Sequence, residues 1–251
     1  MKPFIDNFSK QVDSYHKFRP SYPSNLFEFL SSMTSEHQLS WDCGTGNGQS
    51  ANSLTHYYEK VFATDPSTQQ IENAKLHKRI IYRVETAEKT SLENNTVDLI
   101  TVAQAVHWFN FDNFYSEVKR VLKQDGIIAV WAYGLPIIEN SVDKIIKHFH
   151  DNIVGDFWQA ENRLIENEYE TIPFPFKQIT TPNFFIQKEI SFSDTVGLLK
   201  SWSATQKYID KHNQNPIALI EKELLEIWGE KESEKSATWK LILKVGQNAC
   251  H

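Results

Sequence analysis

The residues best suited to chemistry follow a short apolar run and consist of an acid with three glycines at every second position. In the segment Asp42-Cys43-Gly44-Thr45-Gly46-Asn47-Gly48, the glycines have no β-carbon and allow a ligand to touch the backbone. Residues 49–58 are predicted to form a helix whose first N–H groups point at the same place. The pattern is typical of a site for a nucleotide-like or carboxylate-bearing ligand, but glycine-rich turns are also common as purely structural features.

A second acid, Asp65, ends a predicted strand over 60–65, about 20 residues after the first glycine. One strand–turn–helix–strand unit of this length brings the acid beside the glycine turn. There the carboxylate can accept hydrogen bonds from both hydroxyls of a ribose. The alternative is that Asp65 caps a helix predicted over 67–77, and the sequence Asp65-Pro66-Ser67 is compatible with both roles.

Further candidates follow two more predicted strands, over 79–84 and 97–103. Ligands of an open parallel sheet lie at the carboxyl ends of its strands. The residues there are therefore candidates for ligand binding because of their position and not because of their residue type. The residues selected in this way are Ala87, Glu88, Gln104, His107 and Trp108. For His107 the alternative is a hydrogen-bonded structural histidine.

The elements that must position these residues alternate between strand and helix five times, which predicts an α/β fold with a doubly wound parallel sheet. An amphipathic helix is expected from Phe111, with Gly126 as its stop, and the fifth strand over 127–131. Before the first strand, two helices over residues 1–36 are separated by prolines. Between these helices, Tyr15 and Arg19 either close over the ligand or serve as a loop anchor and a solvated charge.

Beyond Tyr133 the alternation stops. Apolar residues at helical spacing over 139–158, followed by a charged stretch and two prolines, predict a helical insertion over 135–180. The elements expected after it are a strand over 184–192, helices over 195–202 and 216–228, and a last strand over 239–245.

Composition narrows the classes of function. A chain of 251 residues with 40% hydrophobic content can bury a full core, and its net charge of −6 argues against a nucleic-acid partner. Cys43 and Cys250 cannot form a disulfide framework and have no metal-ligand spacing, which predicts a cytoplasmic protein without a metal site. The sequence contains no long apolar run and no leader pattern. It therefore predicts neither a membrane span nor export. The sequence makes no prediction of oligomeric state.

Taken together, four segments resemble the class I S-adenosylmethionine-dependent methyltransferases. These segments are Asp42 to Gly48, Asp65, Thr86-Ala87-Glu88, and Gln104-Ala105-Val106-His107-Trp108-Phe109. Within that family the chain looks most like the trans-aconitate methyltransferase group, a likeness that extends to Tyr15…Arg19-Pro20…Tyr22-Pro23 and to Ser201-Trp202-Ser203. A nicotinamide-dependent oxidoreductase is the competing class, but its G-x-G-x-x-G motif would need glycine at position 49, where the chain has Gln49.

The resemblance implies a Rossmann-like, seven-stranded sheet whose last strand is antiparallel. It divides the chain into N-terminal lid helices (1–36), a cofactor-binding core (37–134), a helical cap insertion (135–180) and a C-terminal completion of the sheet (181–251). It also implies S-adenosyl-L-methionine as cofactor and methyl transfer by direct displacement to a carboxylate of a small organic acid, with Arg19 and His107 as candidate counter-charges. The alternatives are a hydrophobic or lipid-like acceptor, and a protein that binds the cofactor without turnover.

The resemblance further implies which residues form the site. Cofactor-binding candidates are Tyr15, Arg19, Asp42, Gly44, Thr45, Gly46, Asp65, Pro66, Ser67, Gln70, Ala87, Glu88, Gln104 and Ala105. Substrate-binding candidates are His107, Trp108, Trp202 and Ser203, with His107 also the candidate catalytic residue. Many members carry an acid where this chain has Thr86, so the backbone of Ala87 is expected to serve the adenine amino group.

Overall fold

The computed structural model describes residues 18–248, and the predictions for Tyr15 and Cys250 lie outside this part of the chain. Seven strands of one sheet follow in the order β3-β2-β1-β4-β5-β8-β6, and an eighth, β7, pairs with β8 outside that path. Their bounds are β1 Leu39–Cys43, β2 Lys60–Asp65, β3 Ile80–Val84, β4 Val97–Ala103, β5 Leu122–Tyr133, β6 Lys177–Ile179, β7 Phe185–Ser191 and β8 Glu234–Gln247.

Strands β1 to β5 are parallel to one another, and β8 runs antiparallel to β5. The doubly wound parallel sheet predicted from the sequence is therefore confirmed, including its antiparallel late strand. β8 is 14 residues long and pairs with three strands, one of which is β6 over Val245 to Gln247. Its second half pairs with β5 from Leu241 to Gln247, whereas its first half pairs with β7 from Glu234 to Lys240.

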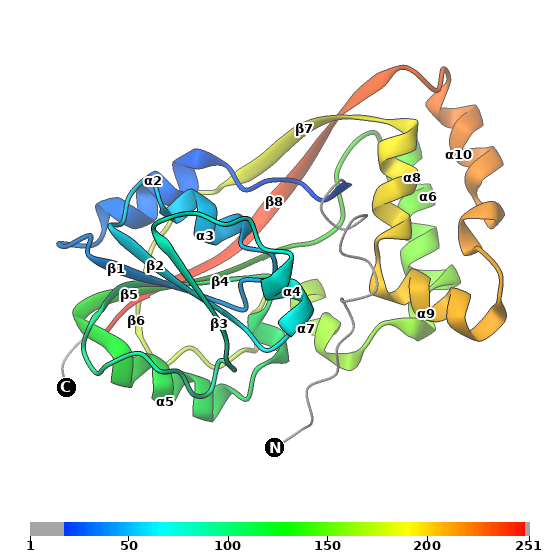
Figure 1. The fold of residues 1–251 in the computed structure, drawn as a ribbon. Coiled ribbons are helices and arrows are strands. Elements are labelled where there is room, and N and C mark those ends of the chain that lie inside the picture. Colours follow the sequence, from blue (N-terminus) through cyan, green and yellow to red (C-terminus); the bar gives the residue numbers. More distant parts are fainter. Residues whose placement is uncertain (1–17, 249–251) are drawn as a thin grey trace.

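Helices cover both faces of the sheet (Figure 1). On one face lie α2 (Ser24–Ser32) and α3 (Gln49–Leu54), and on the other lies α5 (Phe111–Val121). Phe27 of α2 meets Trp131 of β5 edge to face, with ring centroids 6.1 Å apart. Phe114 and Val118 of α5 are fully buried in the second core layer. These two apolar layers fix the strands whose ends form the site.

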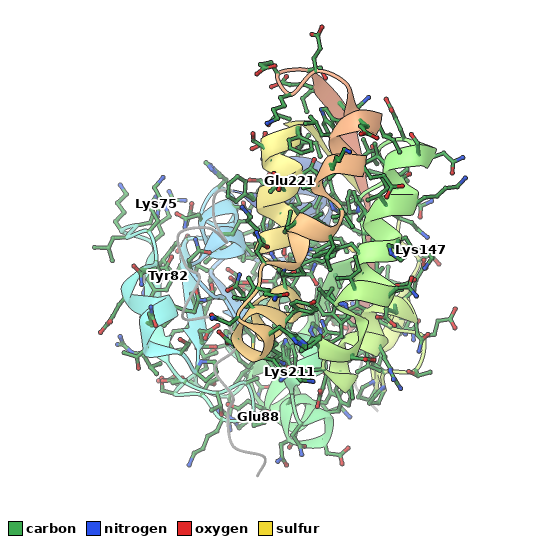
Figure 2. The ribbon with its side chains drawn as sticks, turned by 90° about the vertical axis from the view of Figure 1, so that its right-hand side faces the viewer. Lys75, Tyr82, Glu88, Lys147, Lys211 and Glu221 are labelled. Carbon is green, nitrogen blue, oxygen red and sulfur yellow. The ribbon has the colours of Figure 1, made fainter. Side chains whose placement is uncertain are left out.

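A layer of helices stands beside the sheet, and the β7–β8 ribbon reaches into it (Figure 1). It contains α6 (Asn140–His148), α8 (Phe192–Lys200), α9 (Ser203–His212) and α10 (Glu221–Trp228). Figure 2 faces this layer, with Lys147 on α6, Lys211 on α9 and Glu221 on α10. Because α6 packs against α10, helices from the predicted segments 135–180 and 181–251 lie together.

Two helix ends differ from the predictions. The stop expected at Gly126 is wrong, because α5 ends at Val121 and β5 begins at Leu122, where Leu122 already pairs with Val97 of β4. The helix expected over 67–77 is the short α4 (Thr68–Glu72). At its end the side-chain amide of Asn73 donates to the carbonyl of Gln69 at 2.8 Å, the carbonyl that also accepts the backbone N–H of Asn73.

The cap also departs from regular helix. The helix expected over 139–158 becomes α6, a π-helical turn (Phe149–Ile153) and a 3₁₀ turn (Gly155–Phe157). The sequence did not predict α9, because the residues that α9 buries are the small Ala204 and Thr205 and leave no apolar stripe. Among the described residues, no helix has the length and apolar character needed to cross a membrane.

Candidate active site

The carboxyl ends of β1, β2 and β4 meet at one edge of the sheet and border a cavity of about 1010 Å³. Many of the predicted site residues meet there. Those that line the cavity are Asp42, Gly44, Thr45, Gly46, Asp65, Pro66, Ser67, Gln70, Ala87, Glu88, Gln104, Ala105, His107 and Trp108. The topology accounts for this convergence, because parallel strands place their ends on the same side.

The glycine turn packs too closely against neighbouring side chains for a larger residue to replace Gly44 or Gly48. Gly44 has a φ of +68°, and a β-carbon on it would lie 2.6 Å from the β-carbon of Ala105 and 3.2 Å from the ring of Phe109. Gly48 has a φ of +89°, and a β-carbon there would collide with the hydroxyl of Tyr82. The turn therefore needs glycine for its left-handed backbone and for close packing against the segment that follows β4.

Asp42 fixes the glycine turn to the strands of the sheet. Its carboxylate is 1% exposed and accepts hydrogen bonds from the hydroxyls of Thr45 at 2.5 Å and Thr101 at 2.7 Å. Burial raises the pKa of Asp42 to about 6, and the two threonine hydrogen bonds oppose this rise. The carboxylate thus joins β1 and β4 to the glycine turn.

Asp65 fixes the other side of the turn. Its two oxygens accept the backbone N–H groups of Gly46 and Ser67, each at 2.9 Å. The N-cap of α4 is Ser67, whose hydroxyl accepts the N–H of Gln70 at 3.3 Å. Capping of α4 is therefore the task of Ser67, and Asp65 instead links the end of β2 to the glycine turn while lining the cavity.

The residues after β3 and β4 form the next part of the wall. Gln104 has a φ of +56°, and its amide donates to the carbonyl of Tyr133 at 3.1 Å. Glu88, labelled in Figure 2, accepts the N–H of Asn110 at 3.0 Å. Because Asn110 is the N-cap of α5, this contact connects the β3 end of the cavity to the start of that helix.

His107 lies in the 3₁₀ turn η2 (Val106–Trp108) and is 5% exposed. Its Nδ1 is 2.9 Å from the hydroxyl of Tyr169. Burial lowers the pKa of His107 to about 3, so the imidazole is neutral near pH 7. The interpretation of His107 as a positive counter-charge is therefore wrong. Tyr169 was not predicted as a site residue, because it belongs to the cap and no motif marks it.

The structure does not bring every predicted residue to the cavity. Trp202 is 7% exposed and lies among the rings of Phe149 and Trp158, with centroids 5.9 and 5.7 Å away. It is core of the helical layer and does not line the cavity, and neither does Ser203, the first residue of α9. Arg19 is half-buried and also absent from the cavity wall.

Lining residues that the sequence did not single out come from the cap and the start of α5. They include Phe111, Asp112, Gln159, Glu161, Leu164 and Pro173. The charged side chains on the wall are all acidic, namely Asp42, Asp65, Glu88, Asp112 and Glu161. No lysine or arginine of residues 18–248 lines the cavity. Within the same residues, no group of three histidine, cysteine or acidic side chains is placed to hold a metal ion.

Comparisons with known proteins agree with this geometry. Residues 41–130 match the family described as methyltransferase domain. A Dictyostelium discoideum protein named as a methyltransferase is 37% identical over 229 residues, which cover 90% of this chain and 87% of that protein. A solved structure from Anaeromyxobacter dehalogenans, described as a type II methyltransferase, is 33% identical with a TM-score of 0.87, covering 93% of this chain and 100% of its own.

Proposed function

This chain belongs to the class I S-adenosylmethionine-dependent methyltransferases, and on that premise we propose that it methylates a carboxylate oxygen of a small organic acid. The enzyme's cofactor is S-adenosylmethionine. The observation that carries the proposal is one cavity that is lined both by the glycine turn and by aromatic and aliphatic side chains. Such a cavity can hold a cofactor and an acceptor side by side.

The residues present fit the cofactor. Gly44 and Gly46, both with a left-handed backbone, line the cavity, and Asp65 lines it at the end of β2. In this proposal Gly44 and Gly46 hold the amino-acid part, Asp65 accepts the ribose hydroxyls, and Ala87 and Glu88 lie along the adenine. When bound, S-adenosylmethionine supplies a methyl group on a positively charged sulfur.

A carboxylate acceptor suits the protonation state of the site. Carboxyl groups have a reference pKa of about 4 and are ionised near pH 7, so no proton has to be removed before the oxygen displaces the methyl group. The products are a methyl ester and S-adenosylhomocysteine. A buried neutral His107 is compatible with this reaction, since no general base is required. The protein then acts by positioning, an effect that can supply roughly 7–11 kcal/mol.

The charge and polarity of the cavity wall narrow the class of organic acid proposed as the acceptor. The acidic lining, without a lysine or arginine among the described residues, disfavours an acceptor with several negative charges. Trp108, Phe111, Leu164 and Pro173 offer apolar surface instead. These observations support a monocarboxylic acid with an apolar body. They equally support the second candidate, a hydrophobic or lipid-like acceptor that reacts through another group.

The cofactor is tested by a thermal-shift experiment. S-adenosylhomocysteine at 100 times its Kd is expected to stabilise the protein by about 2.7 kcal/mol, which raises the Tm by roughly 5–10 °C for a chain of this size. NAD at the same concentration is expected to leave the Tm unchanged, because Gln49 stands where a dinucleotide site needs glycine. A shift with NAD and none with S-adenosylhomocysteine would contradict the cofactor assignment.

The acceptor is tested by the chemistry of the product. The enzyme is incubated with cofactor labelled in its methyl group and with apolar monocarboxylic acids, a tricarboxylic acid, and phenols or alcohols of matched size. We expect labelled product mainly from the monocarboxylic acids. Mild base should release the label as methanol, because esters hydrolyse whereas methyl ethers and methylamines do not. A base-stable product would exclude the carboxylate and favour the second candidate.

A further inference from the structure

The contact between His107 and Tyr169 joins the core to the cap at the cavity wall. Tyr169 is fully buried, has a φ of +56°, and donates its backbone N–H to the carbonyl of Leu164 at 2.8 Å. Its hydroxyl is 2.9 Å from Nδ1 of His107. Both side chains are therefore enclosed, and the direction of the hydrogen bond between them has consequences for the ring.

Burial raises the pKa of Tyr169 well above its usual value, so the hydroxyl keeps its proton at neutral pH. Within residues 18–248, Nδ1 of His107 is the hydrogen-bond partner of this hydroxyl. If Nδ1 carried a proton and donated it, the tyrosine proton would remain buried without an acceptor, which is unfavourable. The tyrosine O–H therefore donates and Nδ1 accepts.

A neutral imidazole whose Nδ1 accepts carries its proton on Nε2. Within the described part of the chain, Nε2 has no hydrogen-bond partner, yet it is not among the fully enclosed polar atoms that lack one. It is therefore accessible on a residue that lines the cavity. We infer that Tyr169 fixes His107 as an uncharged donor, whose Nε2–H binds a lone pair of the methyl acceptor.

This inference rests on the proposed function and adds a requirement for the acceptor. A carboxylate satisfies it with one oxygen bound to Nε2–H while the other oxygen displaces the methyl group. An acceptor without a second lone-pair atom beside the reacting atom would leave Nε2–H unpaired and bind more weakly. Tyr169 is thus a positioning residue for the acceptor, and it acts through His107.

The surroundings keep this donor uncharged. Besides Tyr169 in the cap, η5 (Ala160–Asn162) packs against η2 and carries the ionisable side chain Glu161. Burial is the cause of the lowered pKa of His107, so the ring is expected to remain neutral from pH 5.5 to 8. A charged histidine at this point would instead attract an anion through its charge as well as through its N–H groups.

The tautomer is measured by nuclear magnetic resonance on the whole protein, labelled with ¹⁵N in its histidines and saturated with S-adenosylhomocysteine. The His107 ring is assigned as the set of signals that His107→Asn removes. Two-bond proton–nitrogen correlations should show the Nε2–H tautomer and no titration between pH 5.5 and 8. The Nδ1–H tautomer, or a titration near the ordinary histidine pKa of about 6.5, would overturn the inference.

Two matched variants separate positioning from packing. Tyr169→Phe removes the donor and should give His107 a mixture of tautomers, with kcat/KM for the acceptor about 5- to 10-fold lower, mostly through KM. Tyr115→Phe is the control, because the Tyr115 hydroxyl is buried without a partner among the described residues and influences the pKa of Tyr169. It should leave the His107 signals unchanged.

Equal effects of both variants would show that packing alone matters and would overturn the role of Tyr169. If Tyr169→Phe does not fold, the tautomer of the wild-type protein still decides the matter. A wrong cofactor assignment shows separately, as a missing thermal shift with S-adenosylhomocysteine.

Discussion

Gly44→Ala is expected to abolish detectable binding of S-adenosylhomocysteine in calorimetry and to lower the Tm. The new β-carbon would stand 2.6 Å from that of Ala105, and alanine would have to adopt a φ of +68°. The left-handed conformation costs roughly 1–2 kcal/mol and overpacking roughly 1–3 kcal/mol, which together correspond to a fall of about 4–20 °C in Tm. Relief of the clash moves the turn or the segment after β4, and both line the cavity.

The matched control is Gly134→Ala. A β-carbon on Gly134 would meet no atom within 4 Å, and its φ is not positive. This variant should keep the affinity and the Tm of the parent protein, which separates the special position of Gly44 from the general effect of replacing a glycine. Normal cofactor affinity in Gly44→Ala would show that the turn is not the binding surface.

Asp65→Ala is expected to weaken S-adenosylhomocysteine by about 10- to 150-fold in calorimetry, equivalent to roughly 1.5–3 kcal/mol. The variant loses the proposed acceptor of the ribose hydroxyls. It also leaves the N–H groups of Gly46 and Ser67 without the oxygens that hold them at 2.9 Å, so the glycine turn is less well fixed.

Asp65→Asn is the matched variant, because it keeps the shape and one acceptor oxygen while it removes the charge. Its affinity should lie between those of the parent and of Asp65→Ala. Thermal unfolding without ligand reports the structural part of the effect. In both variants α4 retains Ser67 as its N-cap. Unchanged affinity in a folded Asp65→Ala protein would mean that Asp65 only braces the turn.

The core of the site could be predicted because it depends on strand ends. Gly44 follows β1 and Asp65 ends β2, both of which are predicted from short buried runs, and parallel pairing of the two strands brings their ends together. The same rule placed Gln104 and His107 at the edge of the sheet. Local sequence was sufficient there, because each position is fixed by the element immediately before it.

The rest depends on contacts between distant segments. Tyr169 reaches His107 from a part of the cap with no periodic pattern, and Glu161 arrives from a short 3₁₀ turn. The neutral state of His107 follows from enclosure by these segments, which its own neighbours in sequence do not reveal. Trp202 failed as a predicted acceptor residue for the converse reason, because helical packing buries it among other rings.

The antiparallel pairing of β8 with β5 has a consequence for the order of folding. Leu241 pairs with Tyr133 and Gln247 with Ile127, so β5 gains its neighbour from the far end of the chain. Contacts of such long sequence separation form slowly, because a large loop must close first. During synthesis β5 therefore exposes its unpaired N–H and C=O groups while the cap emerges, and until β8 arrives this edge is open to pairing with another copy.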